Sequence, residues 1–314
     1  MFDLICSELS AIFLFFYAIQ RFSKLISRNN ISTLKKIATK LTDNPLKALM
    51  AGAGSSALMQ SNQAVSSIAL MLVNTGIITS IQSLPIMLGT PLGTASTSFL
   101  ISIKFENMEE LLIIAGAILK FTKHKNIGHI VFYFGLLMFS LELMSKAFNT
   151  IQDVENFKKI FLFTNNSFIL FLIGAVASFV TQGAFVIGIL TILVGSNILP
   201  MYNANAMAIG VAMGSTLFIG IIVLSMNKEA KKAWAMLSVL VLICCLAMLP
   251  FVKVFTFIGD VFGGGDFGFA VSNLASRALV SFTGMYIYRY CLLENKLGKI
   301  TKKMMHKIFK VKQN

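Results

Sequence analysis

Charged side chains are scarce in this sequence, and acidic ones are the scarcest. Only 13% of the 314 residues are charged, about half the share found in soluble domains. The chain has 13 acidic residues against 27 basic ones, which gives a formal net charge of +14. The mean hydropathy is +0.78, and the apolar residues occur in blocks separated by short basic loops. These features argue against a soluble globular domain and predict a polytopic membrane protein.

Cysteine and histidine are also rare, which leaves little material for a metal site or a disulfide framework. The cysteines fall in apolar segments and form no Cys-x-x-Cys motif, so they are expected to be packing residues. The histidines are scattered near loops. The sequence contains no Ser/His/Asp set and no phosphate loop, so we expect neither an enzyme nor a bound cofactor. The residues concerned are Cys6, Cys244, Cys245, Cys291, His124, His129 and His306.

The excess of lysine is explained better by a membrane than by nucleic acid. Lysines gather in loops beside apolar segments and in the tail 296–314, and no aromatic–basic recognition motif accompanies them. No signal-peptide pattern precedes the first apolar block, which is therefore expected to be a span. We expect a multi-pass protein of the cytoplasmic (inner) membrane with the lipid bilayer as its partner; the sequence does not define an oligomeric state.

An internal repeat divides the chain into two halves at an offset of 122 residues. Gly52-Ala53 aligns with Gly174-Ala175, Ser56 with Ser178, and Gln60 with Gln182. After a one-residue deletion, GTPLGT (89–94) aligns with GVAMGS (210–215). Because the matches keep the same order and share one offset, an internal repeat explains them better than chance does. The predicted units are a first repeat at 1–126, a second at 127–260, a terminal span at 261–295 and a basic tail at 296–314.

Nine apolar segments are candidates for crossing or entering the bilayer. Two of them, 46–74 and 168–196, are interrupted centrally by polar residues, and each half-segment is shorter than the roughly 20 residues that a span requires. Each could be a re-entrant hairpin or one long helix with a polar face. The seven segments expected to span fully are 4–20, 82–103, 108–122, 127–149, 204–226, 233–258 and 268–291.

The distribution of basic loops favours the hairpin alternative. The loop 21–47 and the tail 296–314 should both be cytoplasmic. If both segments are hairpins, the basic loop 120–126 is also cytoplasmic and the acidic segment 106–110 is external, as the rule requires. If both segments are spans, the basic loop would be external and the acidic segment cytoplasmic, against the rule. Each half then has three spans, so the second is inverted. The expected fold is an all-α membrane protein of two inverted repeats, an arrangement typical of transporters.

Several motifs resemble one family. The segment from Lys40 to Ser98, which contains MQSNQAVSS and GTPLGTAS, resembles the first repeat of the sodium/phosphate cotransporter family, the type II kind and its short bacterial form without a C-terminal regulatory domain. FYFGLLMFSLELMSKAF (132–148) and MNKEAKKAW (226–234) are similar to a span and a basic loop of that family. The resemblance implies a secondary transporter that imports inorganic phosphate by sodium symport.

The family signature Gln-Ser-Ser-Ser is altered in both repeats. It reads Gln60-Ser61-Asn62-Gln63 in the first and Gln182-Gly183-Ala184-Phe185 in the second. The resemblance implies that the signature serines bind sodium and phosphate, so their replacement leaves the coupling ion and cargo open. Two alternatives therefore stand: the same fold transporting another small anion or organic solute, and a degenerate paralogue that does not transport.

The expected ligands for substrate or ion are polar residues at the two interruptions, hydroxyls of the later motif, and one intramembrane arginine. Gln60, Ser61 and Gln182 are the candidate sodium ligands, because sodium is a hard cation that prefers oxygen. The alternative role for the polar residues is hydrogen bonding between helices. The full set is Ser56, Gln60, Ser61, Asn62, Gln63, Thr94, Thr181, Gln182, Ser215, Thr216 and Arg277.

Three of the charged residues within the apolar segments call for an explanation, because a charge is costly there. Arg277 lies near the middle of its segment, beside Asn273 and Ser281 on one helical face. It could be a fixed countercharge for phosphate, whose geometry guanidinium matches, or it could pair with backbone carbonyls. Glu142 precedes Lys146 by four residues and is expected to form a structural ion pair near the membrane interface.

Overall fold

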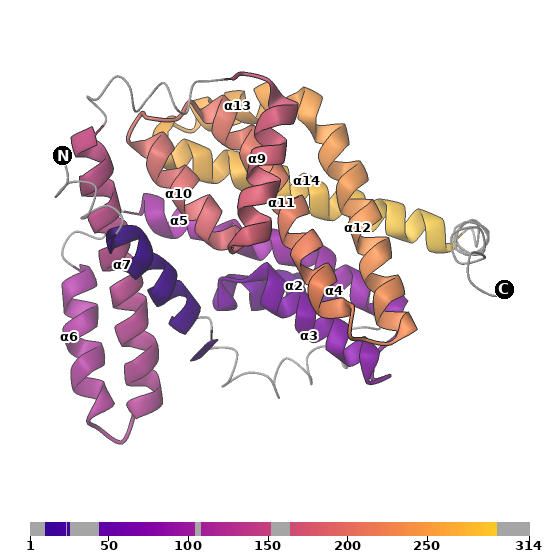
Figure 1. Ribbon diagram of the computed structural model, residues 1–314, viewed down its shortest axis with the longest axis horizontal. Helices are drawn as coiled ribbons and strands as arrows, with labels where there is room; N and C mark the ends of the chain where they lie inside the picture. The colour runs from indigo at the N-terminus through magenta and orange to yellow at the C-terminus, as the bar shows by residue number, and fades with distance from the viewer. Residues whose placement is uncertain (1–9, 23, 26–43, 104–107, 152–163, 294–314) are drawn as a thin grey trace.

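The computed structural model describes residues 10–22, 24–25, 44–103, 108–151 and 164–293. Within these ranges the chain forms helices joined by short turns, and no strand occurs in them (Figure 1). The all-α expectation is therefore confirmed for the described part of the chain. Most of the loop 21–47, the acidic segment 106–107, most of the loop 150–166, the tail and Cys6 lie outside the described residues.

The first half begins with a short apolar helix and continues with two broken helices. The polar interruptions predicted at 60–63 and 181–182 both coincide with breaks between helices. In chain order the elements of this half are Ser10–Phe22, α2 (Pro45–Met59), α3 (Asn62–Asn74), α4 (Ser80–Thr94), α5 (Ser96–Ser102) and α6 (Met108–Lys120).

In the first half, the two short helices α2 and α3 precede the longer helical stretch Ser80–Ser102. The second half again has two short helices before a long one, and a terminal helix follows. Its elements are α7 (Lys125–Ile151), α9 (Ser167–Val180), α10 (Gly183–Gly195), α11 (Met201–Val223), α12 (Lys228–Met248), the single turn η1 (Leu249–Phe251), α13 (Val252–Val261) and α14 (Gly265–Leu293). Figure 1 shows α6 and α7 as a helical pair at one side of the molecule.

Four helical stretches of the described chain are long and apolar enough to cross a membrane. They correspond to four of the seven predicted spans, and they identify a membrane protein. The helices at the other three predicted positions, Ser10–Phe22, α6 and α14, do not meet the same criteria of length and apolarity together, so the full span count stays a prediction. The four stretches are Ser80–Ser102, Lys125–Leu143, Met201–Val223 and Lys228–Val261.

Helices α2 and α4 are in backbone contact because glycines line their interface. A Cβ atom added at Gly52 would lie 2.0 Å from the carbonyl oxygen of Ile86. One added at Gly89 would lie 2.0 Å from the carbonyl oxygen of Leu49. No side chain fits between two backbones this close, so glycine is required at both positions.

The same contact recurs between α9 and α11. A Cβ added at Gly174 would lie 2.0 Å from the oxygen of Met207, and one added at Gly210 would lie 1.9 Å from the oxygen of Phe171. The α9 residues are offset by 122 from those of α2, and the α11 residues by 121 from those of α4. Residues that the sequence offset pairs therefore make equivalent contacts in the α2–α4 and α9–α11 interfaces.

The chain reverses direction at the first break. Gly89 approaches Leu49 while Gly93 approaches Ala53, so α2 and α4 run parallel. After the break, Ser66 of α3 contacts Thr90, and α3 then leads through a short turn into the start of α4. Helix α3 is therefore antiparallel to α4 and to α2. Together α2 and α3 form a helical hairpin whose tip is Gln60–Ser61.

The second break has the same geometry. Gly210 approaches Phe171 and Gly214 approaches Ala175, so α9 and α11 run parallel. Helix α10 starts beside Ser215, where a Cβ on Gly183 would lie 2.5 Å from the serine oxygen, and ends at the turn that opens α11. Helices α9 and α10 therefore form a second hairpin, with its tip at Thr181–Gln182.

The glycine contacts predict that a glycine-to-alanine substitution in α2 or α4 destabilises the protein only where the glycine lies against the neighbouring helix. Gly89→Ala should lower the melting temperature of the detergent-purified protein, because overpacking against backbone costs about 1–3 kcal/mol. Gly54→Ala is the matched control, since among the described residues no heavy atom lies within 4 Å of its Cβ position. Equal melting temperatures for the two variants would contradict the backbone contact.

Candidate functional site

The first hairpin tip is a helix break built from polar residues that are nearly excluded from solvent. Gln60 ends α2 in the left-handed conformation, with φ 48° and ψ 33°, and Ser61 is extended. The Ser61 hydroxyl accepts a hydrogen bond from the backbone N–H of Ala64 at 3.2 Å, which caps α3. All four signature residues, Gln60 to Gln63, are buried with exposed fractions of 4–6%.

The Gln60 amide joins this tip to α5. Thr97 donates to its Oε1 at 2.5 Å, and its Nε2 donates to Ser96 Oγ at 3.1 Å and to the carbonyl of Ala57 at 2.7 Å. Both amide hydrogens and one lone pair are thereby used by the protein itself. Gln60 fixes the tip against α5 and keeps little capacity for a further ligand.

The second tip is less polar and keeps a free acceptor. The Thr181 hydroxyl donates a hydrogen bond to the backbone carbonyl of Ala177 in α9, at 2.7 Å. Gln182 precedes α10 without capping it through its side chain. Its Oε1 is buried and has no hydrogen-bond partner among the described residues. An amide oxygen held in this way can accept from a proton donor or coordinate a cation.

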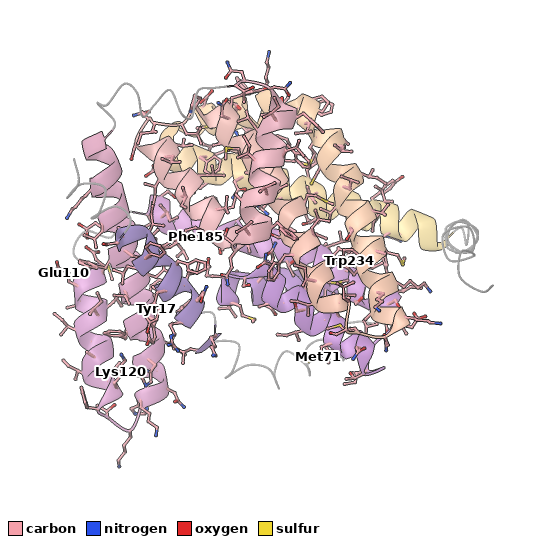
Figure 2. The ribbon with its side chains drawn as sticks, in the orientation of Figure 1. Tyr17, Met71, Glu110, Lys120, Phe185 and Trp234 are labelled. Carbon is pink, nitrogen blue, oxygen red and sulfur yellow. The ribbon has the colours of Figure 1, made fainter. Side chains whose placement is uncertain are left out.

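Hydrophobic packing occupies the last signature position of the second tip. Phe185, labelled in Figure 2, belongs to α10. Its ring packs against those of Phe15 and Phe16 of the N-terminal helix, at centroid distances of 5.6 and 5.3 Å. Gly183 leaves room for the hydroxyl of Ser215, which hydrogen-bonds Ser178 Oγ at 2.6 Å. The two residues that replace signature serines here, Gly183 and Phe185, therefore each fit their neighbours: the glycine leaves space for Ser215, and the phenylalanine fills an aromatic contact.

One hydrogen bond connects the two hairpins directly. Gln63 Nε2, in the first turn of α3, lies 3.4 Å from the backbone oxygen of Ser178 in α9. Ser56, the counterpart of Ser178 in the first repeat, has a buried hydroxyl that finds no partner within the described ranges. A polar contact thus joins the two hairpins, and an unsatisfied hydroxyl lies close by in α2, where Ser56 faces Gly93 of α4.

Several predicted ligands use their hydroxyls within their own helices. Thr94 donates to the carbonyl of Pro91 at 3.0 Å, and Thr216 donates to that of Ala212 at 2.9 Å. Such bonds satisfy a hydroxyl without an outside ligand. Asn62 and Ser215 are buried beside the tips, and Ser215 is already paired with Ser178.

Arg277 lies inside the helical assembly with an exposed fraction of 2%. Its Nε donates to Asn273 Oδ1 at 3.0 Å, and its Nη2 donates to the carbonyl of Ala208 in α11 at 3.4 Å. Asn273 in turn donates to Ser98 Oγ of α5 at 3.0 Å. The carbonyl contact predicted from sequence is therefore present, but it uses only part of the guanidinium.

The sequence prediction missed the role of α5 as the link between these groups. Ser96 and Thr97 bind the first tip, and the next residue, Ser98, binds the Asn273 that holds Arg277. Three consecutive hydroxyl residues behind the helix break at Ala95 were the available signal. Their partners come from α2 and α14, which no local pattern could identify.

Two other expectations concern charges and metals. The ion pair between Lys146 and Glu142 is confirmed, with Nζ and Oε1 2.5 Å apart. Among the residues that the structure describes, no group of three His, Cys, Asp or Glu side chains could hold a metal ion. The sodium ligands expected from the sequence, Gln60, Ser61 and Gln182, would offer amide and hydroxyl oxygens.

The contacts of Gln60 predict how the first tip responds to shortening. Gln60→Asn keeps the amide and tolerates the left-handed backbone, but it cannot reach Ser96 and Thr97. We expect a loss of about 1–3 kcal/mol of stability from the unsatisfied buried groups, seen as a lower melting temperature. Thr181→Val, which removes a bond within one helix, is the control, and a larger effect of this control would contradict the anchoring role.

The chain was compared with known families and proteins. Residues 14–146 match the family model described as Na+/Pi-cotransporter. The "Putative inorganic phosphate export protein YjbB" of Escherichia coli O157:H7 is 27% identical over 262 residues, covering 70% of this chain and 48% of the relative. The protein of that name from strain K12 is 25% identical over 225 residues and is covered to 41%.

A second kind of relative has a more comparable length. "Uncharacterized protein YqeW" of Bacillus subtilis is 24% identical over 235 residues, which covers 73% of this chain and 76% of the relative. The chain spans about half the length of the YjbB relatives that it matches. No solved structure matches. The similarity to the Na+/Pi-cotransporter family is thus shown for residues 14–146, which include the first hairpin and its signature.

Proposed function

We propose that this protein is a secondary active transporter that moves inorganic phosphate across the cytoplasmic membrane by symport with sodium. The family is one of phosphate transporters, and the YjbB relatives are named for phosphate export. The observation that carries the proposal is the meeting of a buried helix break at Gln60–Ser61 with a half-buried one at Thr181–Gln182, joined by the bond from Gln63 to Ser178. Phosphate and sodium would bind between the two hairpin tips.

Burial of the irregular backbone at the first tip supports a transport site there. Helices α2 and α3 have 15 and 13 residues, about 22 and 20 Å of helix, so neither crosses a ~30 Å hydrocarbon core. Inside a bilayer, non-helical backbone persists where it is buried in protein or lines a cavity. Half-helix ends aimed at the midplane supply amides for anions and carbonyls for cations. The hairpins fit that use.

The arrangement of the hairpins supports inverted repeats. The open end of the first hairpin lies beside the end of α11: the Asn227 backbone N–H donates to Asn74 Oδ1 at 2.7 Å. Nearby, the Ser80 hydroxyl donates to Glu229 Oε2 at 2.5 Å. The open end of the second hairpin leads into the start of α11. The hairpins therefore enter from opposite ends of α11, which agrees with units at 1–126 and 127–260.

Sodium is assigned to the oxygen-rich side of the same region. The free Gln182 Oε1 and Ser56 Oγ are buried acceptors that lack protein partners among the described residues. Gln60 and Ser61 contribute through the tip that they shape. An amide or hydroxyl oxygen suits a hard monovalent cation. Of the proposed sodium set Gln60, Ser61 and Gln182, Gln182 holds the free oxygen, and Gln60 and Ser61, whose side chains already bind protein groups, act by shaping the tip.

The direction of net transport follows from the driving gradients. A symporter is a reversible machine, so the same site serves import when sodium enters and export when the phosphate gradient dominates. Import is the direction implied by sodium coupling in a bacterial-type membrane, and export is the direction in the names of the YjbB relatives. Transport of another small anion and absence of transport are the two alternatives.

Uptake of radiolabelled phosphate into proteoliposomes tests this function. We expect uptake driven by an inward sodium gradient and abolished when choline replaces sodium, with protein-free liposomes as the control. Uptake that is equal with and without sodium would remove the coupling. Uptake of sulfate or an organic anion but not of phosphate would establish the alternative cargo, and no uptake of any solute would establish a non-transporting paralogue.

The topology can be tested by labelling single cysteines from each side of the membrane. In a background without the four native cysteines, Lys123→Cys should be labelled only from the cytoplasmic side, and Asp260→Cys only from outside. Both positions are exposed, so access is not limited by packing. Exclusive external labelling at position 123 would remove the inverted-hairpin arrangement.

A further inference from the structure

Arg277 is a buried cation whose hydrogen-bonding capacity is mostly unused. A guanidinium has five N–H donors. Nε makes one bond to Asn273, and Nη2 makes one long bond to the Ala208 carbonyl. Nη1 is inaccessible to solvent and has no partner in the part of the chain that the structure describes. Three of the five donors are therefore open.

No carboxylate neutralises this charge among the described residues. The ion pairs found there are Glu142 with Lys146 and Glu229 with Lys232, neither of which involves Arg277. The ionisable neighbour that faces Arg277 is the thiol of Cys245 from α12, which is itself fully buried. A charge taken out of water without a partner is strongly unfavourable, so such a group needs a ligand when the protein works.

A second unsatisfied group lies one helical turn away. The Ser281 hydroxyl, four residues after Arg277 on the same face of α14, is fully buried and lacks a partner within the described ranges. One turn before Arg277 on this face, Asn273 accepts a hydrogen bond from the guanidinium and donates one to Ser98 of α5. The open donors of α14 are thus positioned by side chains and lie on the helix that packs against α4, α5, α10 and α11.

We infer that Arg277 and Ser281 form the anion-binding half of the transport site, with the open guanidinium edge as the principal ligand of a tetrahedral oxyanion. The planar N–H fork of guanidinium matches two oxygens of phosphate or sulfate, and a serine hydroxyl donates to a third. This inference rests on the proposed function, because the anion it names is the proposed cargo.

The location explains how the protein could lose the signature hydroxyls. The second tip offers Gly183, Ala184 and Phe185 in place of three donors. Helix α14 follows both repeats and supplies a permanent positive charge instead. Arg277 is connected to the first tip through Asn273, the hydroxyl row Ser96–Ser98 and Gln60. The anion and the first hairpin therefore share one hydrogen-bonded support.

Thermal stabilisation of the purified full chain by inorganic phosphate tests the site. Phosphate should raise the melting temperature of the wild type with a saturable dependence, and sulfate should compete if it is also accepted. Arg277→Lys, which keeps the charge but loses the fork, should weaken the apparent Kd about tenfold or more, the range for one charged hydrogen bond. Ser281→Ala should weaken it about two- to tenfold.

Arg289→Met is the matched control, since it removes an exposed arginine from the same helix and should leave phosphate binding unchanged. Arg277→Met should abolish the stabilisation. If that variant does not fold, Arg277→Lys and Ser281→Ala decide, because each keeps the volume nearly constant. A Kd within twofold of wild type in both would overturn the inference, as would a wild type stabilised by no oxyanion.

Two results separate this inference from the proposed function. Arg277-dependent stabilisation by sulfate or another oxyanion, without phosphate uptake in proteoliposomes, would keep the anion site and refute phosphate transport. Sodium-driven phosphate uptake that is unchanged in Arg277→Lys and Ser281→Ala would keep the transporter and refute this assignment.

Discussion

The fold depends on the need to satisfy backbone groups where two helices are interrupted inside an apolar assembly. A break leaves N–H and C=O groups without intrahelical partners, and lipid offers none. At the first break Ser61 caps α3, and the Gln60 side chain bonds the Ala57 carbonyl and α5. The surrounding helices must approach closely enough to provide these partners, which explains the glycine-lined contacts of α2 with α4.

The two halves meet the same requirement with different chemistry. The first tip is held by a glutamine that binds three protein groups. The second is held by packing, with Phe185 against the N-terminal helix and Thr181 bonded within α9. The first tip thus has a polar support and the second an apolar one, and among the described residues of the two hairpins Gln182 Oε1 and Ser56 Oγ are polar atoms left open.

Much of this architecture could be predicted from sequence. Polar residues in the middle of apolar runs located both breaks, at Gln60–Ser61 and Thr181–Gln182, and the pattern of basic loops favoured a hairpin there over one long helix with a polar face. The 122-residue offset anticipated the paired glycine interfaces. The row Ser96–Ser98 and the open edge of Arg277 could not be predicted, because their roles depend on which helices lie opposite. Tertiary packing decides which helices face these residues, and it produces no periodic pattern in the sequence.

The glycine interfaces also determine which parts of the molecule can shift relative to one another. Where Gly89 and Gly210 place backbone against backbone, the two helices interlock without deformable side chains between them, so each pair is a stiff unit. Any exchange of access between the two sides of the membrane must then occur where units meet through longer, weaker contacts. The 3.4 Å hydrogen bond from Gln63 Nε2 to the Ser178 carbonyl is one such contact.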